Sequence, residues 1–387
     1  MTLTIGLNAG EPSGDLLGAG LMRALRQREP DVEFHGIGGD AMLAEGLTPL
    51  GAIDRFAING FVEPLKRFGE LLGVLRRLEA HFVATRPAAF VGIDFNVFNL
   101  LLARRLKRHG IPTLQYVSPS VYAWRRGRIR RIGRAVDAVM TLYPFEPALY
   151  RERGVRADFV GHPMADEIAP VRDAGDARRA LGIPLDATVI ALLPGSRRSE
   201  VELMAAPMLA TAALLAQELP RCVFVVPCVN GSIRERMERH VRLASRTLDV
   251  RLVDGHARLP LTAADAAVVK SGTGTLEAML LRKPMVVTYR LPTLSYHLIK
   301  SLKRSEFVAL PNILAGRPLV PELLQDAGEP RALARALLGE MRRAKEPGYF
   351  DEFARLHDEL KRGGSARAAE VVLDVAGIAT TLVGRTR

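Results

Sequence analysis

Thiol and indole side chains are scarce in this chain, which has two cysteines and one tryptophan among 387 residues. Cys222 and Cys228 fall on one predicted strand, so at about 3.3 Å per residue they lie roughly 20 Å apart. A disulfide needs a much shorter separation, so the two cannot form one. We therefore expect two buried thiols in a protein of a reducing compartment.

Long apolar stretches are also missing. No run approaches the ~20 residues that cross a bilayer, and residues 1–8 read as a short strand without the basic start of a secretory signal. The sequence shows no internal repeat and no low-complexity segment. These absences predict a cytoplasmic protein built of globular domains.

Negative charge is the third shortage, because 42 Asp and Glu stand against 54 Lys and Arg, a net charge of +12. This excess favours an anionic partner, such as a nucleic acid, a phosphorylated substrate or an acidic membrane surface. Residues 116–132 interleave arginines with aromatic side chains, including Trp124, as nucleic-acid-binding segments do. Ile129, Ile132 and Val136 nevertheless follow helical spacing, so the arginines fit a solvated helix face. We expect no nucleic-acid partner.

The length of the chain exceeds what one core supports and predicts two domains. Apolar segments alternate with amphipathic ones, as in parallel sheets covered by helices on both faces. The predicted strands are residues 3–8, 88–93, 113–117, 138–141, 189–193, 222–227, 250–253, 266–269 and 284–289. We predict an α/β fold with two doubly wound, Rossmann-like domains, at 1–165 and 166–350. Residues 351–387 are expected to form helices that pack back on the first domain.

Residues 271–278 read as the end of a strand, a glycine turn and the start of a helix. Gly272 and Gly274 would let backbone N–H groups of Ser271 and Thr273 approach a ligand closely. A helix N-terminus attracts a diphosphate, and Glu277, one turn on, can accept from ribose hydroxyls. The motif therefore suits a nucleotide, although glycine turns before helices are common in α/β proteins.

A second candidate nucleotide site follows the apolar strand at residues 189–193. Ser196 and Arg197 come after a Pro-Gly stop and open the next helix. Parallel sheets bind their ligands at the carboxyl ends of strands, which is where this arginine falls. The alternative is a solvated arginine on a loop.

The turn after the first strand carries Glu11, Ser13 and Asp15 among glycines. The dinucleotide spacing G-x-G-x-x-G is absent, and the carboxylates would repel a pyrophosphate. Such a turn suits the hydroxyl groups of a sugar, or Ser13 simply caps the helix.

Asp94 follows the buried strand at residues 88–93. Desolvation at that position would raise the pKa of its carboxyl towards the range of a general base. The alternative is an N-cap for the following helix.

Residues 61–82 carry an apolar stripe at helical spacing, with Lys66, Arg67, Arg76 and Arg77 beside it. This pattern is typical of a helix that dips into a bilayer interface and receives acyl chains, and equally of an ordinary core helix. The predicted membrane and acyl contacts are Phe61, Val62, Leu65, Phe68, Leu71, Leu72 and Leu75.

Five motifs occur in the order in which the lipid-A-disaccharide synthase family has them, at residues 9–15, 116–125, 192–197, 271–279 and 310–316. The chain thus resembles that family over almost its whole length. The resemblance implies an inverting GT-B glycosyltransferase, with two domains facing a central cleft. It would join UDP-2,3-diacylglucosamine to 2,3-diacylglucosamine 1-phosphate through a β-1,6 linkage and release UDP. No metal and no other cofactor is expected.

The same resemblance assigns roles to single residues. Asp94 becomes the base that deprotonates the acceptor 6-hydroxyl, and Glu11 and Ser13 match acceptor-binding or catalytic positions. The nucleotide side is expected to comprise Ser196, Arg197, Ser271, Gly272, Thr273, Gly274, Glu277 and Asn312. Asn96 and Val97 stand where the family has a proline and a second carboxylate, so Asp94 is the sole carboxylate of this segment.

The resemblance also implies a place at the inner face of the inner membrane, on anionic lipids, and a possible homodimer. Two other functions stay open. One is a different UDP-sugar enzyme of the GT-B type, such as a UDP-N-acetylglucosamine epimerase. The other is a non-catalytic basic protein of the membrane surface.

Overall fold

The structure, a computed structural model, describes residues 2–51, 68–119, 126–169, 173–244, 247–291 and 306–378. The chain divides into two compact units. Unit 1 comprises Met1–Asp166 and Glu359–Arg387, and unit 2 comprises Glu167–Asp358. The first division lies next to the predicted boundary, whereas the return to unit 1 comes at Glu359 rather than at Asp351.

Unit 1 is a parallel sheet of seven strands in the order β3-β2-β1-β4-β5-β6-β7. The strands are β1 (Thr4–Ala9), β2 (Glu33–Ile37), β3 (Leu47–Pro49), β4 (Ala89–Ile93), β5 (Thr113–Tyr116), β6 (Ala138–Thr141) and β7 (Ala157–Phe159). The helices are α1 (Pro12–Arg28), α2 (Asp40–Ala44), α4 (Phe68–Thr85), α5 (Asn96–Arg108), α6 (Ile129–Gly133), α7 (Glu146–Arg151), α8 (Pro163–Glu167) and α18 (Gly364–Val375), with a 3-10 turn at Arg126–Arg128. The order reverses between β1 and β4, which pair directly with Ala9 opposite Ile93.

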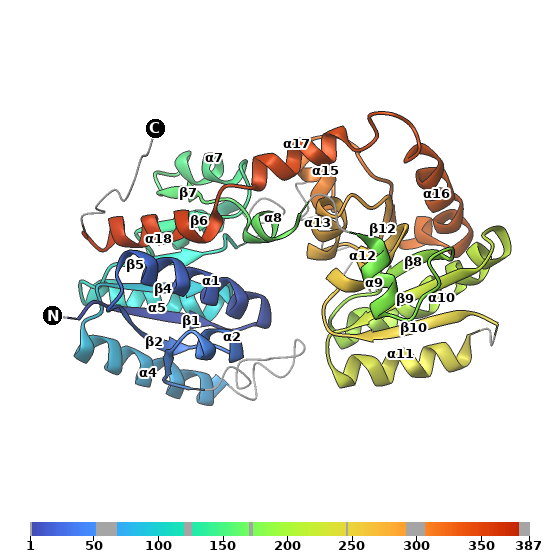
Figure 1. The fold of residues 1–387 in the computed structure, drawn as a ribbon. Helices are drawn as coiled ribbons and strands as arrows, with labels where there is room; N and C mark the ends of the chain where they lie inside the picture. The colour runs from blue at the N-terminus through green and yellow to red at the C-terminus, as the bar shows by residue number, and fades with distance from the viewer. Residues whose placement is uncertain are drawn as a thin grey trace. The chain divides into compact units, whose positions relative to one another are not determined.

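The core of unit 1 forms around its central strands β1 and β4, which are buried on both faces along nearly their whole length. On one face Phe82 of α4 and Leu102 of α5 pack with Phe90 of the sheet. The C-terminal helix α18 packs against α1, where Arg28 pairs with Glu370 at 2.5 Å (Figure 1). Helix α18 therefore belongs to unit 1 together with the N-terminal part of the chain.

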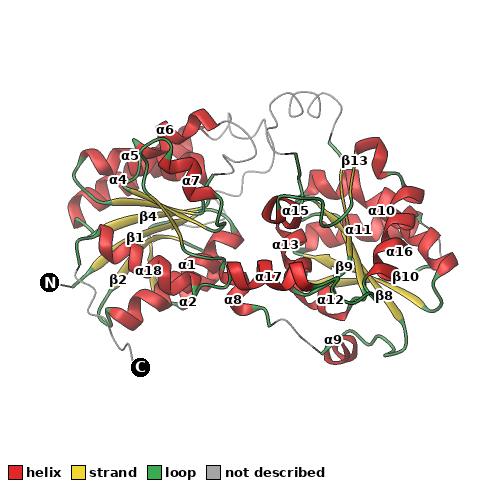
Figure 2. Ribbon diagram, turned by 90° about the horizontal axis from the view of Figure 1, so that it is seen from above, coloured by secondary structure: helices red, strands yellow, loops and turns green. Residues whose placement is uncertain are grey.

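Unit 2 is a parallel sheet of six strands in the order β10-β9-β8-β11-β12-β13, which reverses between β8 and β11. The strands are β8 (Thr188–Leu193), β9 (Cys222–Cys228), β10 (Asp249–Asp254), β11 (Ala266–Lys270), β12 (Met285–Tyr289) and β13 (Glu322–Leu324). The helices are α9 (Ala174–Ala180), α10 (Arg198–Glu218), α11 (Gly231–Leu243), α12 (Arg258–Ala263), α13 (Thr273–Leu280), α15 (Leu310–Ala315), α16 (Pro330–Arg343) and α17 (Asp351–Leu360), with a 3-10 turn at Gln325–Gly328. Helices cover the sheet of each unit on both faces, as predicted (Figure 2).

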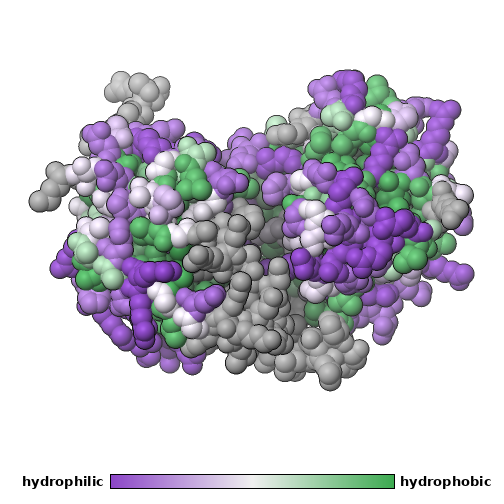
Figure 3. All heavy atoms as spheres, turned by 90° about the horizontal axis from the view of Figure 1, so that it is seen from below, coloured by the Kyte–Doolittle hydropathy of each residue, from purple (hydrophilic) through white to green (hydrophobic). Residues whose placement is uncertain are grey.

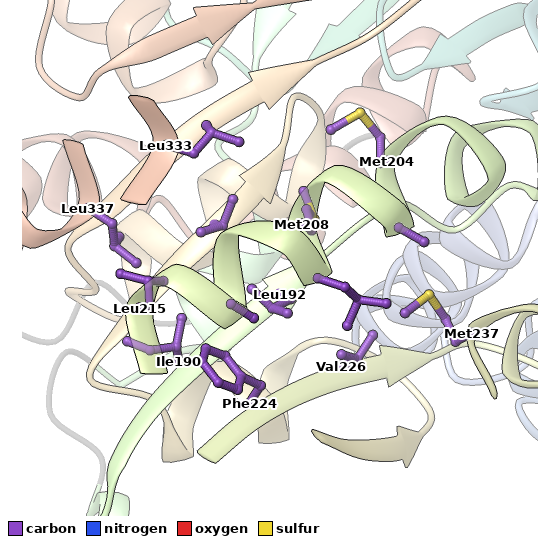
Figure 4. Packing of buried hydrophobic residues seen from close by; sticks show 14 of the residues in the cluster. Ile190, Leu192, Met204, Met208, Leu215, Phe224, Val226, Met237, Leu333 and Leu337 are labelled. Carbon is purple, nitrogen blue, oxygen red and sulfur yellow. The ribbon is translucent and has the colours of Figure 1, made fainter. Parts of the chain in front are cut away.

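Helix α10 packs its apolar side chains on the sheet of unit 2. Met204 and Leu215 lie with Ile190 and Phe224 of the strands and Leu333 of α16 in one buried cluster (Figure 4). By length and composition α10 could also cross a membrane, and it is the one such helix in the described part of the chain. Its packing on the sheet identifies it as a core helix.

The two cysteines both carry free thiols. Cys228 is buried and Cys222 half-buried, and burial raises the pKa of the two thiols to about 11 and about 12. The prediction of buried, unlinked thiols is confirmed for Cys228 and holds in part for Cys222. Among the residues that Figure 3 colours, hydrophilic ones are mixed with several patches of hydrophobic ones.

Candidate functional site

Asp94 begins the turn that follows β4, at the strand reversal of unit 1. Asp94 and Phe95 both have positive φ, at 50° and 40°, a costly backbone for residues with side chains and one that clusters at functional sites. The Asp94 carboxylate accepts from the Phe95 N–H at 3.0 Å, and its side chain is half-buried. Because the N-cap of α5 is Phe95, the alternative that Asp94 caps this helix is wrong.

Buried amides hold the strained backbone of Asp94. Asn99 Nδ2 donates to the carbonyl oxygen of Asp94 at 2.9 Å and to that of Asn8 at 3.0 Å, and it is fully buried. Gln115 Nε2, from the neighbouring strand, donates to the same Asp94 oxygen at 3.2 Å. These hydrogen bonds connect β1, β4 and β5 beneath the turn. They fix the position of the Asp94 backbone and so the point from which its side chain extends.

The first turn of α1 lies against Asp94. A Cβ atom on Gly14 would be 3.5 Å from the Asp94 Cβ, an ordinary contact, while one on Gly10 would collide with the Phe95 ring. Glu11, the N-cap of α1, and Ser13, in its first turn, therefore belong to the same strand-end region as Asp94. Ser13 is exposed.

Two expectations for this turn need correction. Ser13 does not cap α1, because the N-cap position is Glu11. Asp15 does not reach for a sugar, since its carboxylate accepts from the backbone N–H groups of Gly39, Ala41 and Met42 at 2.7 to 3.0 Å. It caps α2 instead, a structural task that uses both oxygens.

The loop after β8, at the strand reversal of unit 2, carries Ser196 and Arg197. Gly195 has a φ of 124°, and a Cβ there would collide with the Glu200 carboxylate. Glu200 Oε2 accepts from the N–H groups of Ser196 at 3.2 Å and Arg197 at 3.4 Å, and Arg197 is the N-cap of α10. The loop is thus held by a capping carboxylate.

The turn after β11 brings Ser271, Gly272 and Thr273 to the N-terminus of α13, as predicted. Gly272 is the N-cap with a φ of 151°, and Thr273 is the first helical residue and exposed. Ser271 Oγ donates to the carbonyl oxygen of Val308 at 2.9 Å. Gly274 packs closely on Leu193 of the adjacent strand, where a Cβ would lie 3.1 Å from Cδ2. Gly274 therefore allows α13 to pack closely on the sheet.

Glu277 lies in α13, largely buried, with Oε1 3.6 Å from Arg258 Nε. Burial raises the pKa of its carboxyl, and the Arg258 charge opposes that rise. A bond from Glu277 to ribose hydroxyls stays a prediction.

Asn312 has a different task from the one expected. Its Nδ2 donates to Val320 O and Glu322 Oε1, both at 2.9 Å, and its Oδ1 accepts from Leu319 N and Val320 N, both at 2.8 Å. Every hydrogen-bonding position of the amide is used inside the protein, and the residue is buried. The Asn312 amide therefore has no hydrogen-bonding position left for a nucleotide, and it supports the surrounding backbone and Glu322 instead.

Lys270 and Glu200 lie beside the turns after β8 and β11 but were not among the predicted site residues. Lys270 Nζ lies 2.8 Å from Glu200 Oε1 and 4.9 Å from the centre of the Tyr289 ring. Burial raises the pKa of the Tyr289 hydroxyl; the Glu200 charge adds to the rise and the Arg197 charge opposes it. The signals were a single lysine ending an apolar strand and a glutamate three residues beyond Arg197.

The predicted membrane stripe falls partly on α4. Leu75 is buried in the core of unit 1, so its assignment as an acyl contact is wrong and the core alternative holds there. Leu71 and Leu72 are half-buried against the same core. Phe61, Val62, Leu65 and the side chain of Phe68 lie outside the described residues, as does Trp124.

In the parts of the chain that the structure describes, no three His, Cys, Asp or Glu side chains are grouped as a metal ion would need.

Comparison with known proteins gives a family and a fold. The sequence model of a family described as lipid-A-disaccharide synthetase matches residues 5–372. Lipid-A-disaccharide synthase of Escherichia coli O157:H7 is 46% identical over 375 residues, covering 97% of this chain and 98% of the relative. The protein of the same name from Methylobacillus flagellatus is 44% identical over 372 residues, covering 96% and 98%.

Two solved structures share the two-domain architecture. UDP-GlcNAc 2-epimerase from Neisseria meningitidis, bound to UDP-GlcNAc, has a TM-score of 0.63 at 12% identity and covers 97% of this chain and 99% of its own. The glycotransferase of kitacinnamycin has a TM-score of 0.62 at 18% identity, with coverage of 96% and 98%. At such low identities the likeness shows the fold alone, which is the GT-B type.

Proposed function

The chain belongs to the lipid-A-disaccharide synthase family, and from that premise we propose how its residues divide the reaction. It is a glycosyltransferase of lipid A biosynthesis that joins UDP-2,3-diacylglucosamine to 2,3-diacylglucosamine 1-phosphate. One observation carries the division. Each unit reverses its strand order once, and the turns at the reversal present Glu11 and Asp94 in unit 1 and Arg197 and the N-terminus of α13 in unit 2.

Asp94 is the proposed general base. Its carboxylate takes the proton of the acceptor 6-hydroxyl, the hydroxyl oxygen forms a bond to the anomeric carbon, and the bond from that carbon to the diphosphate breaks with inversion. The amides beneath the turn support this role, because they hold the Asp94 backbone in one strained conformation. Glu11 and Ser13, in the adjoining turn, are the proposed acceptor contacts.

The nucleotide is assigned to unit 2. Arg197 and the N-terminus of α13 offer positive charge and backbone N–H groups to the departing diphosphate. Ser196, Ser271, Gly272 and Thr273 line these two turns, and Glu277 is the proposed ribose contact. Because these groups neutralise the leaving diphosphate, we propose that no metal ion takes part. An unchanged rate in excess EDTA is the expected result.

The other functions considered have less support. The epimerase likeness is one of fold, while the curated relatives over nearly the whole chain are disaccharide synthases. A turnover assay decides between them. The purified protein should release UDP from UDP-2,3-diacylglucosamine when the 1-phosphate acceptor is present, and should neither epimerise nor hydrolyse UDP-N-acetylglucosamine alone. Release of UDP that does not depend on the acceptor would contradict the proposal.

We place the enzyme in the cytoplasm, peripherally on the inner face of the inner membrane. Acylated substrates support this placement, as do exposed Arg76 and Arg77 beside half-buried Leu71 and Leu72 on α4. A Leu71→Ser/Leu72→Ser variant should bind anionic vesicles more weakly than the parent. Leu243→Ser, at an exposed leucine of α11 in unit 2, is the control and should bind as the parent does. Salt should weaken the attachment of the parent without abolishing it.

A folded double variant that binds vesicles as well as the parent would contradict the role of α4. A homodimer is part of the same proposal, and sedimentation equilibrium of the purified protein tests it.

A further inference from the structure

Lys270 and Glu200 form an ion pair at the strand reversal of unit 2. Their side chains are 15% and 11% exposed, so water screens the pair only weakly. Lys270 is the last residue of β11, and Glu200 lies in the first turn of α10. The pair therefore joins the two turns that are assigned to the nucleotide.

Glu200 creates an electrostatic problem for those turns. Its Oε2 accepts from the N–H groups of Ser196 and Arg197, and Gly195 leaves room for the carboxylate. A full negative charge thus shapes a loop that has to receive an anion. Like charges that are brought together in a poorly solvated site repel strongly, unless a cation cancels one of them.

Lys270 is placed to cancel that charge. Its ammonium donates to Glu200 Oε1 at 2.8 Å and lies 3.6 Å from the position that a Cβ on Gly272 would occupy. The same ammonium lies over the ring of Tyr289, on the neighbouring strand, so its position is determined from several sides.

We propose that Lys270 is a positioning residue for the nucleotide diphosphate: it anchors and neutralises Glu200, so that this carboxylate holds the Ser196–Arg197 loop without repelling the ligand. The inference rests on the proposed function, because only an anionic ligand at these turns gives the lysine this task. The lysine acts through Glu200, which distinguishes it from a residue that binds the phosphate itself.

The test is calorimetry with UDP and with uridine, on the full chain and on four variants whose thermal unfolding is recorded in parallel. Lys270→Met should weaken UDP binding on the order of tenfold and leave uridine binding unchanged, because the diphosphate alone meets the uncancelled charge. Lys270→Arg, which keeps a cation beside Glu200, should bind UDP within about threefold of the parent, and Glu200→Gln is the reference for the double variant. Adding Glu200→Gln to Lys270→Met should restore most of the lost affinity.

Three results would overturn the inference. The first is parent-like UDP binding by Lys270→Met. The second is an equal loss for UDP and uridine, which would mean that the loop has simply come apart. The third is a double variant as weak as Lys270→Met, which would place the lysine on the phosphate directly. A parent chain that does not bind UDP would instead contradict the proposed function.

Discussion

In unit 1 the turns after β1 and β4 present Glu11 and Asp94, whereas in unit 2 the turns after β8 and β11 present Arg197 and Gly272; Gly272 lies two residues after Lys270, which ends β11. Both pairs of turns lie where the strand order reverses in a parallel sheet. The same topology therefore supplies two different sites, one in which carboxylates have roles in the proposed reaction and one in which Lys270 offsets the Glu200 carboxylate beside Arg197. One suits a proton acceptor and the other an anion.

The backbones of the two reversals differ as well. Unit 1 places residues with side chains, Asp94 and Phe95, at positive φ, and buried amides hold them there. The turns at the reversal of unit 2 instead have glycine at positive φ, at Gly195 and Gly272, so N–H groups can approach a ligand without strain. Of the two reversals, only that of unit 1 places a strained side-chain-bearing residue at the position from which a carboxylate has to be aimed.

The largest expected effect is on Asp94. Asp94→Asn removes the proton acceptor but keeps the shape, so turnover should fall on the order of 10² to 10⁴. The melting temperature should stay near that of the parent, because the amides bond to the Asp94 carbonyl oxygen and not to the carboxylate. Initial rates with both substrates measure the loss. Retention of more than about a tenth of the activity would sink the assignment.

Arg197 is the counterpart in unit 2. Arg197→Ala removes one charge-assisted contact, which should weaken UDP binding about 10- to 100-fold. Arg221→Ala, at an exposed arginine paired with Asp186, is the matched control and should leave UDP binding unchanged. Equal losses in the two variants would show a general charge effect and no local contact.

Much of this division could be predicted from the sequence, because strands that are apolar on both faces are easy to recognise. β6 coincides with the prediction, and the turns with Asp94 and Arg197 follow directly from strand ends. β2 was missed since Glu33 and His35 alternate with its apolar residues. β3, β7 and β13 were missed because they have three residues each.

What the sequence could not reveal is how polar side chains are used. Asn312 and Asp15 have the residue types of a binding site, yet hydrogen bonds inside the protein occupy both, to backbone groups for Asp15 and to backbone groups and Glu322 for Asn312. Lys270 and Glu200 meet only because α10 begins beside the end of β11, 70 residues later in the chain. Leu75 shows the same limit, since one periodicity serves a core helix and an interfacial helix alike.

Each unit offers one buried amide that sharpens the comparison. Asn99→Leu and Asn312→Leu should each lower the free energy of unfolding by about 1–3 kcal/mol per group left without its partner. Asn99→Leu should reduce turnover more than UDP affinity, because the amide supports Asp94. Asn312→Leu should reduce UDP affinity more than turnover. Asn312 donates to Glu322, and Glu322 accepts from the N–H of Val308, the residue whose carbonyl oxygen holds Ser271 in the nucleotide turn.

Chemical denaturation gives the free energy of unfolding of each variant. Turnover and UDP binding are then measured on the same folded preparations. The same loss of turnover and of UDP affinity in both variants would contradict separate roles for the two amides.

The last expected effect is on stability alone and concerns its pH dependence. Burial raises the pKa of Glu146, in unit 1, from its ordinary 4.5 to about 8, whereas Arg258 opposes the rise at Glu277 in unit 2. A carboxyl with a raised pKa keeps its proton in the folded state. Its stabilising effect is therefore complete below about pH 4.5 and is lost as the pH rises towards 8. Glu146→Gln should remove this decline, up to ~1.4 kcal/mol per pH unit, and Glu277→Gln should change it less. An unchanged slope in Glu146→Gln would contradict a neutral buried carboxyl.

The division of labour between the two strand reversals is tested most directly by one measurement, the dissociation constant of UDP in Asp94→Asn and Arg197→Ala. The account predicts that Asp94→Asn binds UDP within about twofold of the parent although its turnover is lost, and that Arg197→Ala binds UDP at least about tenfold more weakly. Equal loss of UDP affinity in both variants, or a loss confined to Asp94→Asn, would contradict it.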